Sequence, residues 1–211
     1  MDFSFTEEQQ MLKSNVRKFL DSEIAPVVDE HEKRGPLTKK EATAFIGQLM
    51  PFGYLLGFLP EDCGGSNLEA KTNGILVEEL GRVWASLAGT IFIAAGFFWL
   101  LNEAGNPDQK KRLMPLAASG DYIGCLAITE PDVGSDVSGV KTTATLTGQH
   151  YVMNGTKTWI SNGTIADAAF VLATTDKTLG AMGMSFFLVE RDQSPFEARE
   201  LHKLGLRCFP T

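Results

Sequence analysis

The sequence has few cysteines and no excess of basic residues. Cys63, Cys125 and Cys208 are widely spaced in a chain of 211 residues and form no Cys-x-x-Cys pair. They therefore give neither a disulfide framework nor a zinc-ligand spacing, and such isolated thiols are typical of a reducing compartment. The net charge is -7 and the pI about 5.0, so a general role in binding nucleic acid has no electrostatic support.

The N-terminal residues lack the features of a secretory signal. Residues 1–8 are polar and acidic, with neither a basic segment nor an apolar one. Asn154-Gly-Thr156 and Asn162-Gly-Thr164 match the glycosylation sequon, but without a signal they favour turns. We therefore expect a cytoplasmic protein.

Hydrophobic residues make up 44% of the chain and charged residues 21%, which is typical of a globular protein with a substantial core. Helix signals fill residues 1–120 and strand signals fill residues 121–211, with little alternation between them. The order predicts a multi-domain α+β protein. We expect an N-terminal all-α helical bundle over 1–120, then an antiparallel, β-barrel-like middle domain over 121–211 that is incomplete at its C-terminus.

Three capping boxes predict helix starts, because a Ser or Thr is followed three residues later by Glu or Gln. They are Thr6 with Gln9, Thr38 with Glu41, and Ser66 with Glu69. From Val83 to Asn102 there is no charged residue. That length permits a membrane span, but polar and glycine residues interrupt the stretch, so we favour a helix buried in a bundle.

The second half contains short apolar or β-branched runs, and the pair Asn154-Gly155 predicts a hairpin turn. The expected strands are Tyr122–Thr129, Thr142–Thr147, Tyr151–Asn154, Thr156–Ile160, Ala168–Thr174, Ser185–Glu190 and Phe196–Glu200. The first of them ends in Thr129 and Glu130, and Pro131 then forces a turn because it has no N–H group. Gly134 and Ser135 follow in a loop whose backbone N–H groups suit a phosphate.

Several stretches, in order along the chain, resemble the acyl-CoA dehydrogenase family. They are Phe5–Gln9, Leu59–Gly65, Gly105–Pro115, the signature Ala127–Asp136, the segment Asn154–Asn162 and Gly205–Arg207. The resemblance covers nearly the whole chain. Asp132 and Val133 depart from it, because small residues are commoner at both positions.

The resemblance implies FAD, an acyl-CoA substrate and oxidation of the α,β carbon–carbon bond, as in fatty acid β-oxidation. It assigns cofactor binding to Leu126, Ala127, Ile128, Thr129, Gly134, Ser135, Trp159, Ile160 and Ser161. Thr129 would donate to the pyrimidine side of the flavin, where a donor stabilises negative charge. Trp159 would face the flavin ring, Ser161 would approach its N5, and Ser135 would also lie near the substrate. Alone, Trp159 could equally be a core aromatic, and Thr129 and Ser161 solvated or turn residues.

No catalytic base is assigned in this chain. Glu130 has a structural place in the family's flavin loop, so we do not expect it to remove a proton. His31, His150 and His202 lie in unrelated contexts, and neither a nucleophile elbow nor a metal spacing is present. In the family the base comes from a C-terminal helical domain, and the family also implies a homotetramer and an electron-transfer flavoprotein as partner.

Two alternatives remain open at this point. One keeps the flavin but reacts with oxygen, as in acyl-CoA oxidases and flavin monooxygenases, and the other is a non-catalytic, flavin-free subunit. For the substrate, Ile91, Phe92, Phe97, Phe98 and Trp99 fall where the family places the acyl cavity. Only Arg82 is a nearby cation, so we favour an apolar acyl group over a dicarboxylic one such as glutaryl.

Overall fold

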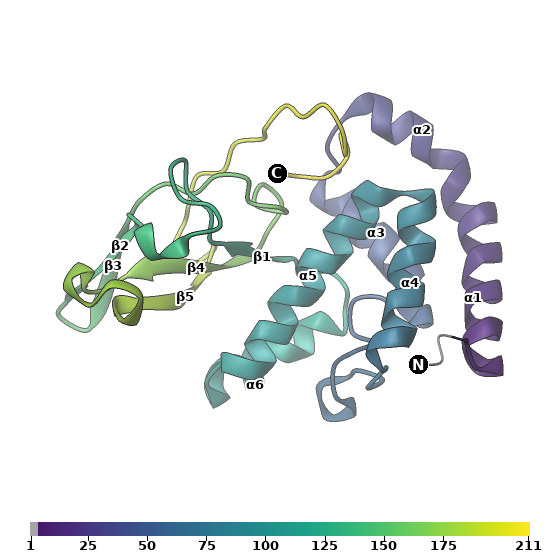
Figure 1. The fold of residues 1–211 in the computed structure, drawn as a ribbon, viewed down its shortest axis with the longest axis horizontal. Helices are drawn as coiled ribbons and strands as arrows, with labels where there is room; N and C mark the ends of the chain where they lie inside the picture. Colours follow the sequence, from purple (N-terminus) through teal and green to yellow (C-terminus); the bar gives the residue numbers. More distant parts are fainter. Residues whose placement is uncertain (1–3) are drawn as a thin grey trace.

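The structure, a computed structural model, describes residues 4–211. The helices lie on one side of the molecule and the sheet on the other (Figure 1). The helices are α1 (Glu7–Phe19), α2 (Ala25–Arg34), α3 (Lys39–Leu49), α4 (Ala70–Val83), α5 (Ala85–Ala104) and α6 (Pro107–Ala117). A π-helical turn, η1 (Leu20–Ile24), connects α1 to α2, so the chain bends just before Pro26. Short 3₁₀ turns, η2 (Met50–Phe52) and η3 (Glu61–Cys63), follow α3.

Two of the three predicted capping boxes are confirmed. Thr6 and Thr38 each cap a helix reciprocally with the side chain three residues later. The box at Ser66 is wrong, because α4 begins at Ala70 and Glu69 itself is the N-cap. A further reciprocal box is formed by Asn106 with Gln109 at the start of α6.

The uncharged stretch forms α5, the central helix of the molecule. This helix, Ala85–Ala104, is long and apolar enough to cross a membrane by length and composition alone, but half of its apolar stretch is buried inside the protein. Phe97 and Phe98 are fully buried there, and the Phe97 ring lies 4.9 Å from that of Phe170 in the sheet. This burial agrees with the interpretation of the stretch as a bundle helix.

The strands form one five-stranded mixed sheet. They are β1 (Gly124–Ala127), β2 (Thr143–Thr147), β3 (His150–Asn154), β4 (Ala168–Thr174) and β5 (Met184–Glu190). The central strand β4 is parallel to β1 and antiparallel to β5, while β2 pairs with β3 and touches β4 through Thr143 and Thr174. The α+β class is confirmed, and the purely antiparallel pairing that we expected is wrong because β1 runs parallel to β4.

Two further strand predictions are wrong, because Thr156–Ile160 and Phe196–Glu200 form no strand. The strand predicted over Tyr122–Thr129 is confirmed only for Gly124–Ala127, which is β1. The hairpin between β2 and β3 turns at Gly148, whose φ is 64°, and not at Asn154-Gly155. Backbone hydrogen bonds of segment 156–160 go to the signature loop instead of to a neighbouring strand, as described below.

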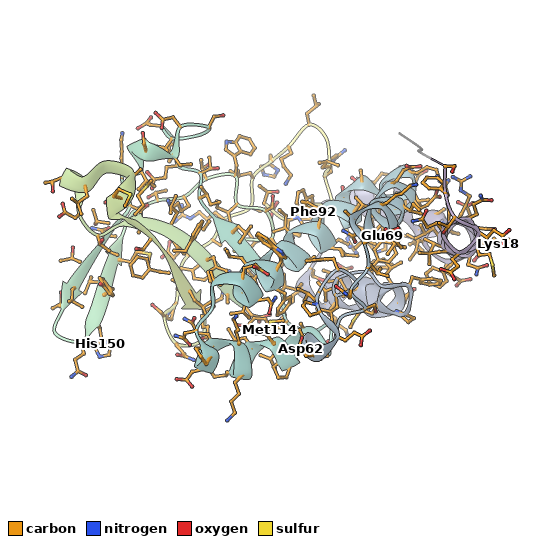
Figure 2. All side chains as sticks on the ribbon, turned by 60° about the horizontal axis from the view of Figure 1, so that its bottom comes forward. Lys18, Asp62, Glu69, Phe92, Met114 and His150 are labelled. Carbon is orange, nitrogen blue, oxygen red and sulfur yellow. The ribbon has the colours of Figure 1, made fainter. Side chains whose placement is uncertain are left out.

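The helices and the sheet share one hydrophobic core. Ala168 and Phe170 of β4 belong to the same buried cluster as the side chains of α1 to α6. A Cβ atom at Gly124 would lie 2.0 Å from the Phe97 ring, so only glycine permits α5 to approach β1 so closely. Lys18 and His150 lie at opposite ends of the molecule, with Phe92 of α5 between them (Figure 2).

The C-terminal segment returns from the sheet to the helices (Figure 1). Leu37 N donates to Cys208 O at 2.9 Å. The carboxylate of Glu32 accepts from the backbone N–H groups of Arg207 and Cys208 at 3.1 and 3.3 Å. It also accepts from Trp84 Nε1 at 2.9 Å, so one side chain of α2 joins the α4–α5 junction to the end of the chain.

Candidate functional site

The signature loop turns directly after β1. Glu130 N and Val133 N each bond the other residue's carbonyl oxygen, at 2.9 and 3.1 Å, so Pro131 and Asp132 occupy the corner of a β-turn. Proline is favoured at the first corner position of such a turn. Gly134 and Ser135 follow it on the exposed surface.

The two predicted flavin motifs lie side by side, although 29 residues separate Ile128 from Lys157. Thr158 N donates to Thr129 O at 3.0 Å. Lys157 Nζ donates to Ile128 O at 2.9 Å and pairs with Glu130 Oε1 at 2.8 Å. Segment 156–160 is therefore fastened to the signature by a lysine whose role the sequence analysis did not recognise.

Glu130 is a buried structural anchor. Its carboxylate is 4% exposed and accepts from Lys141 N, Thr142 N and Thr142 Oγ1, besides the ammonium group of Lys157. Although burial opposes ionisation, these donors hold the pKa of Glu130 at about 2. A carboxylate with so low a pKa and with both oxygens hydrogen-bonded is a poor base, which agrees with its expected structural role.

The polar groups predicted to bind the cofactor are available. Trp159 is 60% exposed and has a φ of 59°, a backbone conformation that is costly for a bulky side chain. Its exposure excludes the alternative of a core aromatic. Within residues 4–211, the hydroxyl groups of Thr129, Ser135 and Ser161 make no hydrogen bond to protein.

The apolar residues of the two motifs pack toward α5. Ala127 and Cys125 are buried in a small cluster against which Ile93 and Ile160 pack, and Leu126 is half-buried beside Gly96. Ile128 is half-buried. Among the described residues, no hydrogen bond joins Gly134 or Ser135 to segment 156–161. These two residues are connected to that segment only through the β-turn that precedes them.

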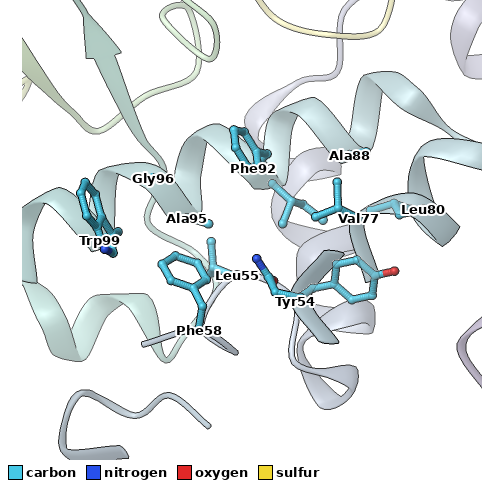
Figure 3. Close-up of a pocket in the computed structure, with 12 residues that line it drawn as sticks. Tyr54, Leu55, Phe58, Val77, Leu80, Ala88, Phe92, Ala95, Gly96 and Trp99 are labelled. Atoms are coloured by element: carbon cyan, nitrogen blue, oxygen red, sulfur yellow. The ribbon is translucent and has the colours of Figure 1, made fainter. Parts of the chain in front are cut away.

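A mainly apolar cavity of about 300 Å³ lies between α4, α5 and the loop after η2 (Figure 3). Phe92 and Trp99 line it from α5, and Tyr54, Leu55 and Phe58 lie on the opposite side. Gly96 lies at its wall, and a Cβ atom added to Gly96 would lie 3.8 Å from Leu126 Cδ1 of β1, so the cavity adjoins the signature strand. Of the predicted acyl-cavity residues, Ile91, Phe92 and Trp99 line it, whereas Phe97 and Phe98 face the core.

Arg82 does not line this cavity. Its guanidinium bonds Asp21 at 2.7 Å and Glu79 at 3.3 Å, on the side of α4 that faces α1. The polar residues of the lining are Tyr54, whose hydroxyl donates to Leu76 O at 2.6 Å, and Asn73. Among the part of the chain that the structure describes, no charged side chain belongs to the lining.

Two family models match the chain: the N-terminal domain of acyl-CoA dehydrogenases over residues 6–121, and the middle domain over residues 125–211. The chain belongs to the acyl-CoA dehydrogenase family. Its three free cysteines form no disulfide, and residues 4–211 contain no group of three or more His, Cys, Asp or Glu side chains that could hold a metal.

Relatives in this family act on different acyl groups. The chain is 34% identical to the glutaryl-CoA dehydrogenase of Desulfococcus multivorans over all of its length and 54% of the relative's. It is also 34% identical to the short-chain specific acyl-CoA dehydrogenase of Clostridium acetobutylicum, over 100% and 55% of the two chains. The chain thus spans about half the length of the curated relatives it matches.

A solved relative has the same fold. The structure of a glutaryl-CoA dehydrogenase of Mycobacterium smegmatis in complex with FADH2 superposes with a TM-score of 0.86 at 31% identity, covering 98% of this chain and 51% of that one. In the present acyl-CoA dehydrogenase chain, Trp159 offers an exposed aromatic face, and Thr129 and Ser161 offer hydroxyl donors that are unpaired within the described residues, which are the groups that suit a flavin. The residues present therefore fit the cofactor of that relative.

Proposed function

We propose that this protein is part of an FAD-dependent acyl-CoA dehydrogenase that oxidises the α,β carbon–carbon bond of an acyl-CoA thioester. The observation that carries the proposal is the junction of Thr158 N with Thr129 O, 3.0 Å apart, beside an apolar cavity. It brings together the two motifs that the family resemblance assigns to the flavin. Bound FAD would supply the acceptor for a hydride from the β carbon.

Each residue of the site then has a defined task. The hydroxyl of Thr129 would donate to the flavin ring, the hydroxyl of Ser161 would serve its reactive N5 side, and Trp159 would offer its aromatic face. Gly134 and Ser135, exposed beyond the β-turn, would bind phosphate through backbone N–H groups and a hydroxyl. Leu126, Ala127, Ile128 and Ile160 would supply the apolar part of the site.

The cavity on α5 receives the acyl chain. Its walls are mainly aliphatic and aromatic, and none of the described residues that line it is charged. An unpaired carboxylate would be costly in such a place, so we propose an apolar acyl group, aliphatic or alicyclic. We also propose an electron-transfer flavoprotein as the electron acceptor and a homotetrameric assembly, both on the resemblance. A cytoplasmic location is proposed on the three unpaired cysteines, which are typical of a reducing compartment.

The test of the cofactor assignment compares two tryptophans that are both about half exposed. FAD is titrated into the 211-residue chain and binding is followed by flavin fluorescence and absorbance. We expect weak binding, because the chain's loops leave much of the cofactor in water. Trp159→Ala should weaken it about three- to tenfold, the value of one aromatic contact. Trp99→Ala, at the acyl cavity, should leave it unchanged.

Equal effects of the two substitutions would remove Trp159 from the flavin site. If the parent chain bound no FAD even at the highest cofactor concentration tested, the alternative of a flavin-free subunit would be favoured. If flavin is bound, reoxidation by air of the reduced flavin in an active preparation of the enzyme distinguishes a dehydrogenase from an oxygen-reacting relative, because the proposed function requires slow reoxidation there.

A further inference from the structure

Asn162 joins three segments that are distant in sequence. Its side chain is fully buried, and Nδ2 donates to Thr90 O on α5 at 2.8 Å. Its backbone N–H donates to Pro210 O in the C-terminal segment at 2.7 Å. Its own carbonyl oxygen accepts from Ile165 N at 3.0 Å. The residue therefore connects the end of segment 156–161 to α5 and to the end of the chain.

The backbone at this position selects asparagine. Asn162 has a φ of 64°, in the left-handed region that asparagine adopts more readily than most residues. The following turn is held separately, because Arg191 Nη2 donates to Gly163 O at 2.6 Å and Gly163 N donates to Ile160 O at 2.9 Å. Asn162 Oδ1 has no hydrogen-bond partner among the described residues, so the bond to Thr90 is what fixes the side chain.

The two ends of this bond lie next to the two halves of the proposed site. Thr90 directly precedes Ile91 and Phe92, which line the apolar cavity, and Asn162 directly follows Ser161. Phe209 packs on α5 at Gly89, one residue before Thr90, so the C-terminal segment covers the same junction. A shift of segment 159–161 along α5 would break the bond.

We infer that Asn162 is a positioning residue, which holds segment 159–161 at a fixed height along α5 and so sets the flavin motif against the acyl cavity. The inference rests on the proposed function for what the segment binds. The positioning itself is a property of the chain without cofactor. The side chain of Asn162 contributes to this positioning through one buried donor, Nδ2. Its acceptor, the carbonyl oxygen of Thr90, is held in place by the long helix α5.

The first experiment measures amide hydrogen exchange of the 211-residue chain without cofactor. Asn162→Gly keeps the left-handed backbone and removes the side chain, while Asn162→Asp keeps the size and removes the donor. The control is Asn67→Gly, because Asn67 also has a positive φ, of 49°, and is exposed. We expect amides of residues 158–165 to exchange about tenfold faster in both Asn162 variants, with amides of α3 unchanged.

An exchange rate in residues 158–165 that matches the parent, or that rises as much as the rate in α3, would overturn the positioning role, because a chain that is merely destabilised opens everywhere.

The second experiment titrates FAD into the same variants. Both Asn162 variants should bind it about tenfold more weakly, and the fluorescence of the bound flavin should rise because Trp159 covers it less firmly. Parent-like affinity and fluorescence in Asn162→Asp would overturn the inference. Failure of the parent chain to bind FAD would contradict the proposed function, and the exchange experiment would still decide the role of Asn162.

Discussion

Glu130 shows how a single side chain organises the signature loop. Its carboxylate joins the turn after β1 to Lys141 and Thr142 before β2, and through Lys157 to the second motif. The same carboxylate stands shortly after strand β1, within the signature of the proposed flavin site, a position at which a base would be expected from the sequence alone. The hydrogen bonds decide against that role, because they use the carboxylate to fix the loop.

The buried ion pair of Glu130 with Lys157 predicts a contribution to stability that is lost in acid. The pKa of Glu130 falls from an ordinary value of 4.5 to about 2 in the folded protein, so its stabilisation is complete above pH 4.5 and is lost as the pH falls toward 2. Glu130→Gln should lower the free energy of unfolding at pH 7 by about 3 kcal/mol. It should also flatten the decline of stability between pH 4.5 and 2. Urea unfolding at several pH values measures both effects.

The control is Asp132→Asn, which breaks the exposed pair of Asp132 with Lys141. Exposed pairs contribute little to stability, so this variant should unfold like the parent at every pH. If Glu130→Gln kept the full pH dependence of the parent, the acid-sensitive group would lie elsewhere.

Thr129 is expected to act on the reaction more than on binding. In an active preparation of the enzyme, Thr129→Ala should slow flavin reduction by up to about a hundredfold. This value is the lower end of the range seen when one donor to a developing negative charge is removed, and we expect the lower end because the backbone N–H remains. Acyl-CoA affinity should change much less. Stopped-flow reduction and the flavin midpoint potential test this, with Thr129→Ser as the variant that keeps the hydroxyl. A potential and a reduction rate equal to those of the parent would refute the assigned role.

Among the secondary-structure elements, α2 holds the C-terminal segment against the helices through Glu32. Hydrogen bonds from Ser86, Trp84 and two backbone amides lower the pKa of this half-buried carboxyl, although burial opposes them. Glu32→Ala should release residues 207–211, seen as faster amide exchange at Arg207 and Cys208, and should cost about 1.5–3 kcal/mol of unfolding free energy. Glu30→Ala, on the exposed side of α2, is the control.

No change in exchange at Arg207 and Cys208 would mean that Phe209 and the other contacts of the segment suffice to hold it. The amides of β4 give an internal comparison, since their hydrogen bonds are remote from Glu32. A loss confined to residues 207–211 is the expected pattern.

The elements that the sequence predicted well are those with local signals. The boxes at Thr6 and Thr38 fix helix starts through neighbouring residues, and the apolar length of α5 determines its burial. Thr156–Ile160 has the β-branched and aromatic composition of a strand, yet its Thr158 N–H bonds Thr129 O and its Trp159 turns left-handed. Such tertiary hydrogen bonds override local preference, so neither this segment nor the parallel pairing of β1 with β4 could be derived from local pattern.

The site residues were predicted from the family resemblance, and those with distant partners were missed. The family resemblance named Thr129 and Trp159, and the structure shows that their motifs are neighbours. Lys157 and Asn162 went unrecognised because their partners, Ile128 O, Glu130 and Thr90 O, are distant in sequence. A lysine flanked by two threonines in a segment next to a buried glutamate is a signal only once the fold places them together.

For the molecule as a whole, we expect no turnover of acyl-CoA by the 211-residue chain alone. The carboxylates of the signature are all engaged: Glu130 in its buried network, Asp132 with Lys141, and Asp136 with Ser138. A positioned base contributes about 10²- to 10⁴-fold, so the α-proton of the thioester would stay in place. An assay with an artificial electron acceptor and saturating FAD tests this, and steady turnover would show that a base exists within these residues.

The shape and charge of the cavity predict the acyl group. Its lining is mainly apolar, and Arg82, the only cation that the sequence offered nearby, is held by Asp21 and Glu79 on the far side of α4. In an active preparation, kcat/KM should be at least about tenfold higher for an apolar acyl-CoA than for glutaryl-CoA of similar size, since a terminal carboxylate would enter the cavity unpaired. Arg82→Ala should leave this ratio unchanged, because the guanidinium takes no part in the cavity. A preference for glutaryl-CoA that disappears in Arg82→Ala would mean that Arg82 leaves its two carboxylates to meet the substrate, and the assignment of an apolar acyl group would then be wrong.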